Sequence, residues 1–309
     1  MSKDSQGRAA MCILLNEGSG KRETSARGRI GAALQAHGVT ADIRVLAKGP
    51  DIVPAARRAV KEGYETIVAA GGDGTISAVA SVLRGTDRVM GILPMGTFNY
   101  FARSLDIPDD IEGAAQLLAE GTQRPVRIAT INERSFLNNA SLGAYPAILK
   151  TREDVYRRWG RSRIAAYWSV LVTLVTLRRP LHLRIEADGQ TVERRTPLVF
   201  AVNNAFQLDQ IGLQGRQDIA EGRLALFVAP DSGRWGMLRH ALSLAMGKAQ
   251  NEVNFDLITG STIRIEARHS PRDIACDGER ARMKAPYILG VDEEALSVIV
   301  PQSRKEGTR

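Results

Sequence analysis

The fold is decided by the stretch Thr66-Ile67-Val68-Ala69-Ala70-Gly71-Gly72-Asp73-Gly74-Thr75-Ile76. Its apolar start is too short for a helix and is stopped by glycines, so it predicts a buried strand of a parallel sheet. After Thr75, apolar residues recur at helical spacing, namely Ile76, Val79, Ala80, Val82 and Leu83. The stretch therefore predicts a strand, a glycine turn and a helix in succession.

The glycine turn carries one charged residue, Asp73. Bare backbone N–H groups and a helix N-terminus together form a site for an anion. Because a carboxylate repels bound phosphate unless a divalent cation lies between them, Asp73 suggests a Mg²⁺–nucleotide site. An ordinary strand-to-helix turn with Asp73 as the N-cap explains the same residues. From this stretch alone, both interpretations stay open.

The composition bounds the class of protein. With 309 residues, of which 44% are hydrophobic and 25% charged, the chain is expected to form two globular domains. Cys12 and Cys276 lie far apart without a CxxC pair, which argues against a disulfide scaffold or a zinc site. The polar N-terminus predicts no signal peptide. A net charge of +8 would attract nucleic acid, anionic lipid or phosphorylated ligands alike.

Strands and helices alternate on both sides of the central stretch. The expected strands are Met11–Leu15, Ala41–Leu46 and Val89–Leu93, and the expected helices are Ser25–His37, Asp51–Glu62 and Asp109–Glu120. This alternation predicts a doubly wound parallel sheet, which binds its ligands at the C-terminal ends of the strands.

A second strand-to-helix turn follows the strand Val89–Leu93, with the sequence Pro94-Met95-Gly96-Thr97-Phe98-Asn99. We expect Thr97 to cap the helix that begins there. Two glycine turns in one sheet can face the same cleft, and their combination is a stronger signal than either alone.

Beyond an expected linker, Gly121–Pro125, alternating β patterns dominate. The expected strands are Val126–Ile131, Ser135–Ala140, Leu181–Ala187, Thr191–Arg195, Leu198–Asn203, Arg223–Val228 and Thr262–Ala267. Asp188-Gly189 is a hairpin turn signal. We therefore expect an α/β nucleotide-binding domain at residues 1–124 and an antiparallel β-sandwich at residues 125–309, whose C-terminal segment can pack back on the first domain.

Two apolar segments interrupt the β pattern. Ile164–Leu177 is uncharged and flanked by arginines, and it is either a core helix or an interfacial helix whose neighbouring arginines contact lipid phosphates. Trp235–Gly247 has the same two interpretations. Neither segment is long enough to span a bilayer.

Four motifs in this order resemble the diacylglycerol kinase catalytic family, in particular bacterial lipid kinases of the diacylglycerol/sphingosine kinase superfamily. They are Gly71-Gly72-Asp73-Gly74-Thr75, Pro94-x-Gly96-Thr97-x-Asn99, Phe136-Leu137-Asn138-Asn139-Ala140-Ser141-Leu142-Gly143 and Asp277-Gly278-Glu279. The resemblance covers nearly the whole chain, and it implies an α/β nucleotide domain and a β-sandwich lipid domain.

The resemblance also implies roles for single residues. Residues expected at the ATP phosphates are Gly71, Gly72, Gly74, Thr75, Thr97 and Asn99, with Asp73 acting through Mg²⁺. Asn16, Ser19 and Gly20 match the family's first nucleotide loop, although Glu17 replaces its proline.

Glu279 resembles the general base that removes the proton of the lipid hydroxyl, with Asp277 beside it. A plain hairpin turn explains Asp277-Gly278-Glu279 as well, because Asp-Gly is a turn dipeptide. Asp218 and Glu221 have the spacing of a structural Mg²⁺ site in relatives. Glu221 stands at a position where those relatives have an aspartate. Other departures from the family are Tyr100 and Arg127, which replace acidic residues, and Leu46, which replaces a threonine.

The leading hypothesis is an ATP- and Mg²⁺-dependent kinase of lipid metabolism that phosphorylates the hydroxyl of a membrane lipid such as diacylglycerol. We expect a cytoplasmic protein that is peripheral to the inner face of the membrane. The alternatives are a lipid- or nucleotide-binding module of the same fold with weakened catalysis, and an NAD kinase-type enzyme that shares the GGDGT motif. Because the basic residues are dispersed, nucleic acid is not an expected partner. The identity of the acceptor lipid stays open.

Overall fold

The computed structural model describes residues 10–16, 26–143, 180–231, 236 and 255–302. The expected helix Ile164–Leu177, nearly all of Trp235–Gly247, and Ser19 and Gly20 lie outside the described residues. The chain divides into two units. Unit 1 comprises Met1–Ile128 and Asp292–Arg309, and unit 2 comprises Ala129–Val291.

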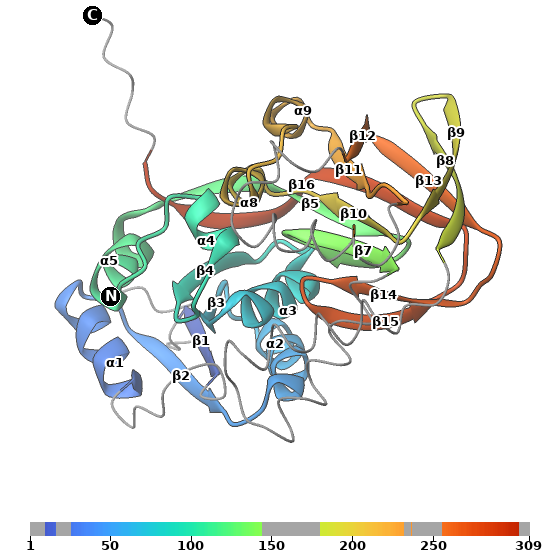
Figure 1. Ribbon diagram of the computed structural model, residues 1–309. Coiled ribbons are helices and arrows are strands. Elements are labelled where there is room, and N and C mark those ends of the chain that lie inside the picture. Colours follow the sequence, from blue (N-terminus) through green and yellow to red (C-terminus); the bar gives the residue numbers. More distant parts are fainter. Residues whose placement is uncertain (1–9, 17–25, 144–179, 232–235, 237–254, 303–309) are drawn as a thin grey trace, which may run out of the picture. The chain divides into compact units, whose positions relative to one another are not determined.

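Unit 1 contains a parallel sheet with the strand order β2-β1-β3-β4, and the last part of β16 extends it beside β4 (Figure 1). Its strands are β1 (Met11–Asn16), β2 (Ala41–Leu46), β3 (Thr66–Gly71), β4 (Val89–Pro94), most of β5 (Thr122–Ile131) and the end of β16 (Tyr287–Val300). Its helices are α1 (Ala26–Ala36), α2 (Ile52–Lys61) after the 3-10 turn η2 (Gly49–Asp51), α3 (Asp73–Leu83), α4 (Tyr100–Ser104) and α5 (Ile111–Glu120).

Helices cover both faces of this sheet, which explains the continuous apolar runs of its strands. Alternate residues such as Ile13 and Val68 pack in one core with Ile30 of α1 and Ala114 of α5. The residues between them, such as Cys12, are equally buried and face the side where α2 and α3 pack on β1 and β3. The sheet is therefore doubly wound, as the alternation of strands and helices predicts.

Two local predictions for unit 1 are wrong. The expected linker Gly121–Pro125 instead contributes residues 122–125 to β5, so the expected domain boundary at 124/125 falls inside a strand. Thr97 does not cap α4, because the N-cap position is held by Asn99 in the left-handed conformation with φ of 50°. Thr97 is exposed two residues earlier.

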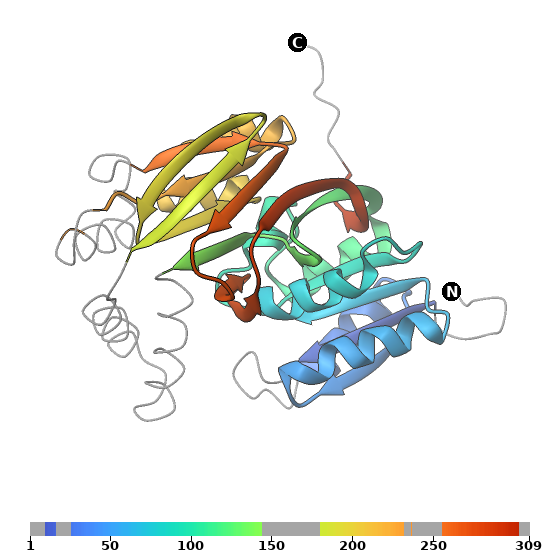
Figure 2. The same cartoon turned by 90° about the vertical axis from the view of Figure 1, so that its right-hand side faces the viewer.

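Unit 2 is built from antiparallel strands in two sheets (Figure 2). One sheet has the order β16-β13-β8-β9, with β5 paired to β16 and β6 paired to β5, and the other has the order β12-β11-β10-β7-β14-β15. The strands are β6 (Arg134–Phe136), β7 (Asn139–Gly143), β8 (Leu181–Ala187), β9 (Gln190–Thr196), β10 (Leu198–Val202), β11 (Leu224–Val228), β12 (Asp256–Gly260), β13 (Thr262–Ala267), β14 (Arg272–Cys276) and β15 (Glu279–Met283).

The two sheets of unit 2 enclose one apolar core, to which both contribute alternate residues such as Ile185 of β8 and Leu226 of β11. The helices α8 (Ala205–Ile211) and α9 (Arg216–Ala220) pack on the other face of the second sheet, around Leu208 and Phe227. The β-sandwich expected from the alternating patterns is confirmed.

The strands β8 and β13 have the predicted bounds, and Asp188-Gly189 forms the predicted hairpin turn with positive φ at both residues. The expected strand Ser135–Ala140 is wrong, because the chain breaks at Leu137 and Asn138 into β6 and β7. Among the described residues, no helix is long and apolar enough to cross a membrane.

Candidate active site

The two glycine turns of unit 1 touch through their backbones. The end of β3 lies beside the end of β4, with Gly71 paired to Pro94, and the N–H of Met95 donates to the carbonyl of Gly71 at 2.9 Å. A Cβ placed on Gly96 would lie 2.7 Å from the Cα of Gly72, which is closer than Cβ atoms approach other atoms in proteins. The prediction that both turns meet at one edge of the sheet is confirmed, and the contact requires glycine.

Asn99 fixes the conformation of the second turn. It is 4% exposed, and its Oδ1 accepts from the N–H of Gly96 at 3.0 Å while its Nδ2 donates to Oδ1 of Asp109 at 3.1 Å. Asp109 is itself paired with Arg103 at 2.9 Å. An acidic side chain thus contacts Asn99 from ten residues further along the chain, although the residue directly after Asn99, Tyr100, is not acidic. Asp109 was not predicted as a site residue, because its partner Asn99 is not adjacent in sequence.

A hydrogen bond links the end of β1 to the GGDGT turn. Nδ2 of Asn16 donates to Oγ1 of Thr75 at 2.9 Å, and the N–H of Thr75 donates to the carbonyl of Gly72 at 2.9 Å. Thr75 is 2% exposed. These two residues from separate motifs therefore hold the edge of the sheet where three parallel strands end.

Asp73 is the first residue of α3, and Gly72 occupies the N-cap position without a side-chain bond. The N-cap interpretation of Asp73 is therefore wrong. Its Oδ1 accepts from the N–H of Phe101, at the start of α4, at 3.4 Å. Asp73 is half-buried, and it brings a carboxylate, the kind of oxygen ligand that Mg²⁺ prefers, to the junction of both glycine turns.

In unit 2, Asp277 and Gly278 form the two-residue turn between β14 and β15, with φ of 47° and 84°. The backbone is thus the hairpin turn that the dipeptide predicts. The Asp277 carboxylate also accepts three backbone N–H groups, from Leu137 at 2.7 Å, Asn138 at 2.9 Å and Asn139 at 3.1 Å. These bonds tie the turn to the break between β6 and β7.

Glu279 begins β15 directly after this turn. Its side chain is 62% exposed, and Oε2 accepts from Nη2 of Arg134 at 2.8 Å. Asp277 and Glu279 therefore have different surroundings: the first is engaged by backbone amides, and the second displays its carboxylate at the surface of unit 2.

Side-chain amides extend the network around Asp277. Nδ2 of Asn203 donates to the carbonyl of Leu137 at 3.1 Å, and Nδ2 of Asn204 donates to Oδ1 of Asn138 at 2.8 Å. Asn204 also accepts from the first N–H groups of α8 and caps that helix. Asn203 and Asn204 were not predicted as site residues, although two amides at the end of an apolar strand are a signal for a buried polar network.

The remaining predicted positions are not joined to these groups. Asp218 lies in α9, and the Glu221 carboxylate accepts from Gln217 at 2.8 Å. In the part of the chain that the structure describes, no group of three or more His, Cys, Asp or Glu side chains could hold a metal ion. The structural Mg²⁺ site at Asp218 and Glu221 stays a prediction.

The three departures from the family lie in different surroundings within unit 1. Leu46 ends β2, and the ring of Tyr100 stacks on that of Phe98 with 5.4 Å between centroids. Burial lowers the pKa of Arg127, and the Glu293 carboxylate 4.0 Å away opposes this shift. Arg127 therefore has a carboxylate neighbour in the last part of β16.

Comparison with known proteins gives two matching domains. The model of the diacylglycerol kinase catalytic domain matches residues 10–131, and that of the YegS C-terminal NAD kinase beta sandwich-like domain matches residues 145–300. The chain belongs to the diacylglycerol kinase and YegS lipid kinase family. The four motifs that suggested this family are therefore correctly interpreted at the level of the family.

Relatives within the lipid kinase family include "Probable lipid kinase YegS-like" of Cronobacter sakazakii (strain ATCC BAA-894), which is 34% identical over 47% of this chain and 49% of its own length. "Diacylglycerol kinase" of Staphylococcus aureus (strain JH9) is 33% identical over 47% of this chain and 46% of its own. The chain thus matches about half the length of these curated relatives. The crystal structure of a diacylglycerol kinase from Bacillus anthracis str. Sterne has a TM-score of 0.69 at 20% identity, covering 95% of this chain and 97% of that one, which shows the shared fold.

Proposed function

We propose that this member of the lipid kinase family transfers the γ-phosphoryl group of ATP to the hydroxyl of a membrane lipid such as diacylglycerol, with Mg²⁺ as the metal. The observation that carries the proposal is the contact between Gly72 and Gly96, which brings two glycine turns and Asp73 together where parallel strands end. Ligands of doubly wound sheets bind at this edge.

The residues of unit 1 fit a metal-bound triphosphate. The N–H groups at the start of α3 and the absence of side chains at Gly71, Gly72 and Gly96 leave a backbone cradle that phosphate oxygens can approach. Asn99 and the Asn16–Thr75 pair keep this cradle in one conformation. Asp73 would hold the metal, which when bound neutralises charge on the transferring phosphoryl group.

In unit 2, we propose Glu279 as the general base for the acceptor hydroxyl, because its carboxylate is exposed and stands on a turn that Asp277 fixes. Asp277 accepts three N–H bonds, so we assign it a positioning role in place of proton transfer. Arg134, bound to Oε2 of Glu279, would orient the base and would have to release it when the hydroxyl binds.

The test is a phosphorylation assay with purified full-length protein, radiolabelled ATP, and mixed micelles that contain one lipid each from a panel of diacylglycerol, sphingoid base and phosphatidylglycerol. We expect one lipid to be labelled when Mg²⁺ is present and labelling to cease when the metal is chelated. Glu279→Gln should lower kcat by a factor of at least about 100, as removal of a general base does.

Three outcomes would contradict the proposal. If NAD is phosphorylated and no lipid is, the chain is an NAD kinase-type enzyme. If calorimetry detects nucleotide binding but no lipid releases ADP, the chain is a binding module that has lost turnover. If Glu279→Gln keeps the parent's kcat, another group is the base. Arg282→Gln, on the same exposed strand β15, is the control for a change of surface charge.

A further inference from the structure

We infer that the face of strands β9, β8 and β13 in unit 2 that no other described element covers binds the phosphate groups of an anionic lipid surface, through a row of basic side chains that we call the basic row. The basic row consists of Arg195, His182 and Arg268. The choice of a lipid as the source of the phosphates rests on the proposed function.

The strand register places these three side chains next to one another. His182 of β8 is paired with Arg195 of β9, and Leu183 is paired with Ala267 of β13, so that Arg268 lies beside His182. The N–H of Arg268 donates to the carbonyl of His182 at 3.3 Å. All three residues are exposed, whereas Leu181 and Leu183 on either side of His182 are buried in the sandwich core. Neighbouring strands are about 4.8 Å apart, so adjacent phosphates can contact adjacent members of the row.

The neighbouring rows of the same face contain both arginine and glutamate side chains, and the basic row contains no carboxylate of its own. Across the strands, Arg184 stands between Glu193 and Glu266, and Glu186 is paired with Arg264. In the basic row, Arg195 pairs with Asp231 at 3.0 Å, while His182 and Arg268 have no ion-pair partner among the described residues. Arg268 therefore carries a charge that no neighbouring carboxylate among the described residues balances, and this favours an external anionic partner.

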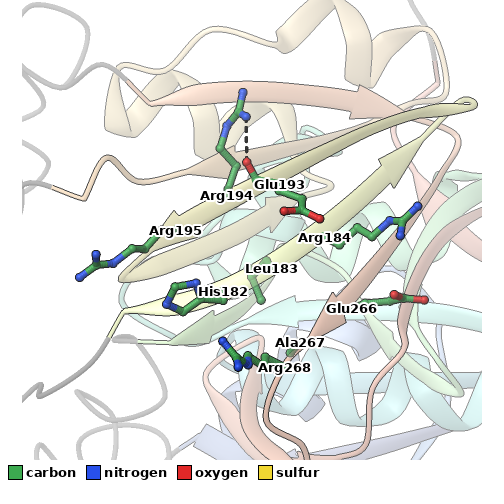
Figure 3. A pocket seen from close by; sticks show the side chains of 9 residues that line it. All are labelled: His182, Leu183, Arg184, Glu193, Arg194, Arg195, Glu266, Ala267 and Arg268. Carbon is green, nitrogen blue, oxygen red and sulfur yellow. Dashed lines mark hydrogen bonds between the residues drawn. The ribbon is translucent and has the colours of Figure 1, made fainter.

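The basic row borders a hollow of about 530 Å³ over the sheet. Figure 3 shows the basic row toward one end of this hollow, and Arg184 and Glu266 toward the other. Four arginines and two glutamates line it. Two of these arginines have a carboxylate partner outside the lining, Arg194 with Asp256 and Arg195 with Asp231, whereas Arg268 has no ion-pair partner among the described residues. Among the described residues that line it there is no Phe, Tyr or Trp, the rings on which a groove for single-stranded nucleic acid stacks its bases. An open, basic and polar surface fits a layer of anionic headgroups.

The test measures binding of the full-length protein to vesicles by sedimentation, without turnover. The probes are vesicles of phosphatidylcholine with 30 mol% phosphatidylglycerol and vesicles of phosphatidylcholine alone. We expect binding to the first only, and we expect Arg195→Gln with Arg268→Gln to weaken it about 30-fold, since each basic residue near an anionic surface contributes a factor of roughly five. Asp231→Asn, which releases Arg195 from its ion pair, should tighten binding severalfold.

The matched control is Arg57→Gln with Arg58→Gln, which removes the same charge from exposed positions of α2 and should leave binding close to that of the parent. Circular dichroism melting checks that each variant is folded. Equal losses in both double variants would show that only net charge matters and would overturn the inference, as would unchanged binding in Arg195→Gln with Arg268→Gln. If the parent and the control bind single-stranded DNA and Arg195→Gln with Arg268→Gln does not, the surface binds nucleic acid instead.

Phosphorylation of a detergent-solubilised lipid separates this inference from the proposed function. Loss of vesicle binding with unchanged kcat in micelles supports a docking role for the basic row. Vesicle binding by a parent protein that phosphorylates no lipid leaves the surface established and contradicts the proposed kinase. If the parent protein phosphorylates lipid in micelles but does not bind anionic vesicles, the inference of a docking surface is wrong and the proposed function still stands.

Discussion

Gly96 approaches Gly72 so closely that Gly96 cannot carry a side chain without a shift of the turns: a Cβ on Gly96 would lie 2.7 Å from the Cα of Gly72, and a Cβ on Gly72 would make a tight contact of 3.3 Å with the Cα of Gly96. The Cα of Gly72 is a backbone atom, which cannot turn aside as the end of a side chain can, and the same Cβ would lie 2.7 Å from Oδ1 of the buried Asn99. The two turns therefore hold one another in place, and the cradle proposed for ATP depends on both.

Gly96→Ala should consequently separate the turns. We expect a loss of about 1–3 kcal/mol in the free energy of unfolding, as for other insertions into a packed site, and under the proposed function at least a tenfold weaker affinity for ATP. Urea denaturation and calorimetric titration with ATP measure the two effects. Gly28→Ala is the control, because this exposed position in α1 has open space for a Cβ and should gain up to about 1 kcal/mol. Parent-like values for Gly96→Ala would show that the contact is not required.

Substitutions of Asp277 and of Glu279 should change the free energy of unfolding by different amounts. Asp277→Ala leaves three backbone N–H groups without their acceptor, and we expect it to lower the free energy of unfolding by about 3 kcal/mol. Glu279→Gln removes only an exposed ion pair and should change it by less than about 1 kcal/mol. Urea denaturation measures both. A stable Asp277→Ala variant would contradict the positioning role.

The bond between Asn16 and Thr75 can be measured by a double-mutant cycle. Asn16→Ala and Thr75→Val each remove one partner of the 2.9 Å bond, and we expect a coupling energy of about 1 kcal/mol in the free energy of unfolding. Asn16→Ala combined with Ser81→Ala is the control pair, because Ser81 bonds to the carbonyl of Ala78 within its own helix. Additive effects in the first cycle would show that the bond does not stabilise the turn.

The sequence predicts those parts of the fold that depend on local patterns. The central strand and its glycine turn are apparent from Thr66–Gly71, because an apolar run stopped by glycines has few other interpretations. The alternation in Leu181–Ala187 gives β8 with its bounds, since polar and apolar residues face opposite sides of a half-exposed sheet.

Predictions fail where tertiary contacts override local preference. Thr97 is a good N-cap residue, but Asn99 takes the position because its amide bonds to Gly96 and to the distant Asp109. Residues 122–125 resemble a linker, but β5 begins there and extends through this stretch. Asp277 was expected beside the base, and its three bonds to residues 137–139 depend on a contact between segments about 140 residues apart.

The two cysteines give a prediction for pH. Burial raises the pKa of both Cys12 and Cys276 to about 12, so the folded protein keeps the thiols neutral. Because only the unfolded chain ionises them above its own pKa of about 9, their contribution to stability is complete below pH 9 and is lost as the pH rises toward 12. At pH 8 the folded protein should react with a thiol reagent such as dithionitrobenzoate about 1,000-fold more slowly than the protein in 8 M urea.

Cys276→Ala separates the titration from packing. The lost sulfur lowers the free energy of unfolding by an amount that does not depend on pH, whereas the titration adds a difference that does. The gap between the parent and Cys276→Ala should therefore be constant from pH 6 to 8.5 and should shrink between pH 9 and 11 as the unfolded parent ionises its thiol. A gap that stays constant to pH 11 would show that Cys276 ionises equally in both states, and hence that its burial does not keep the thiol protonated.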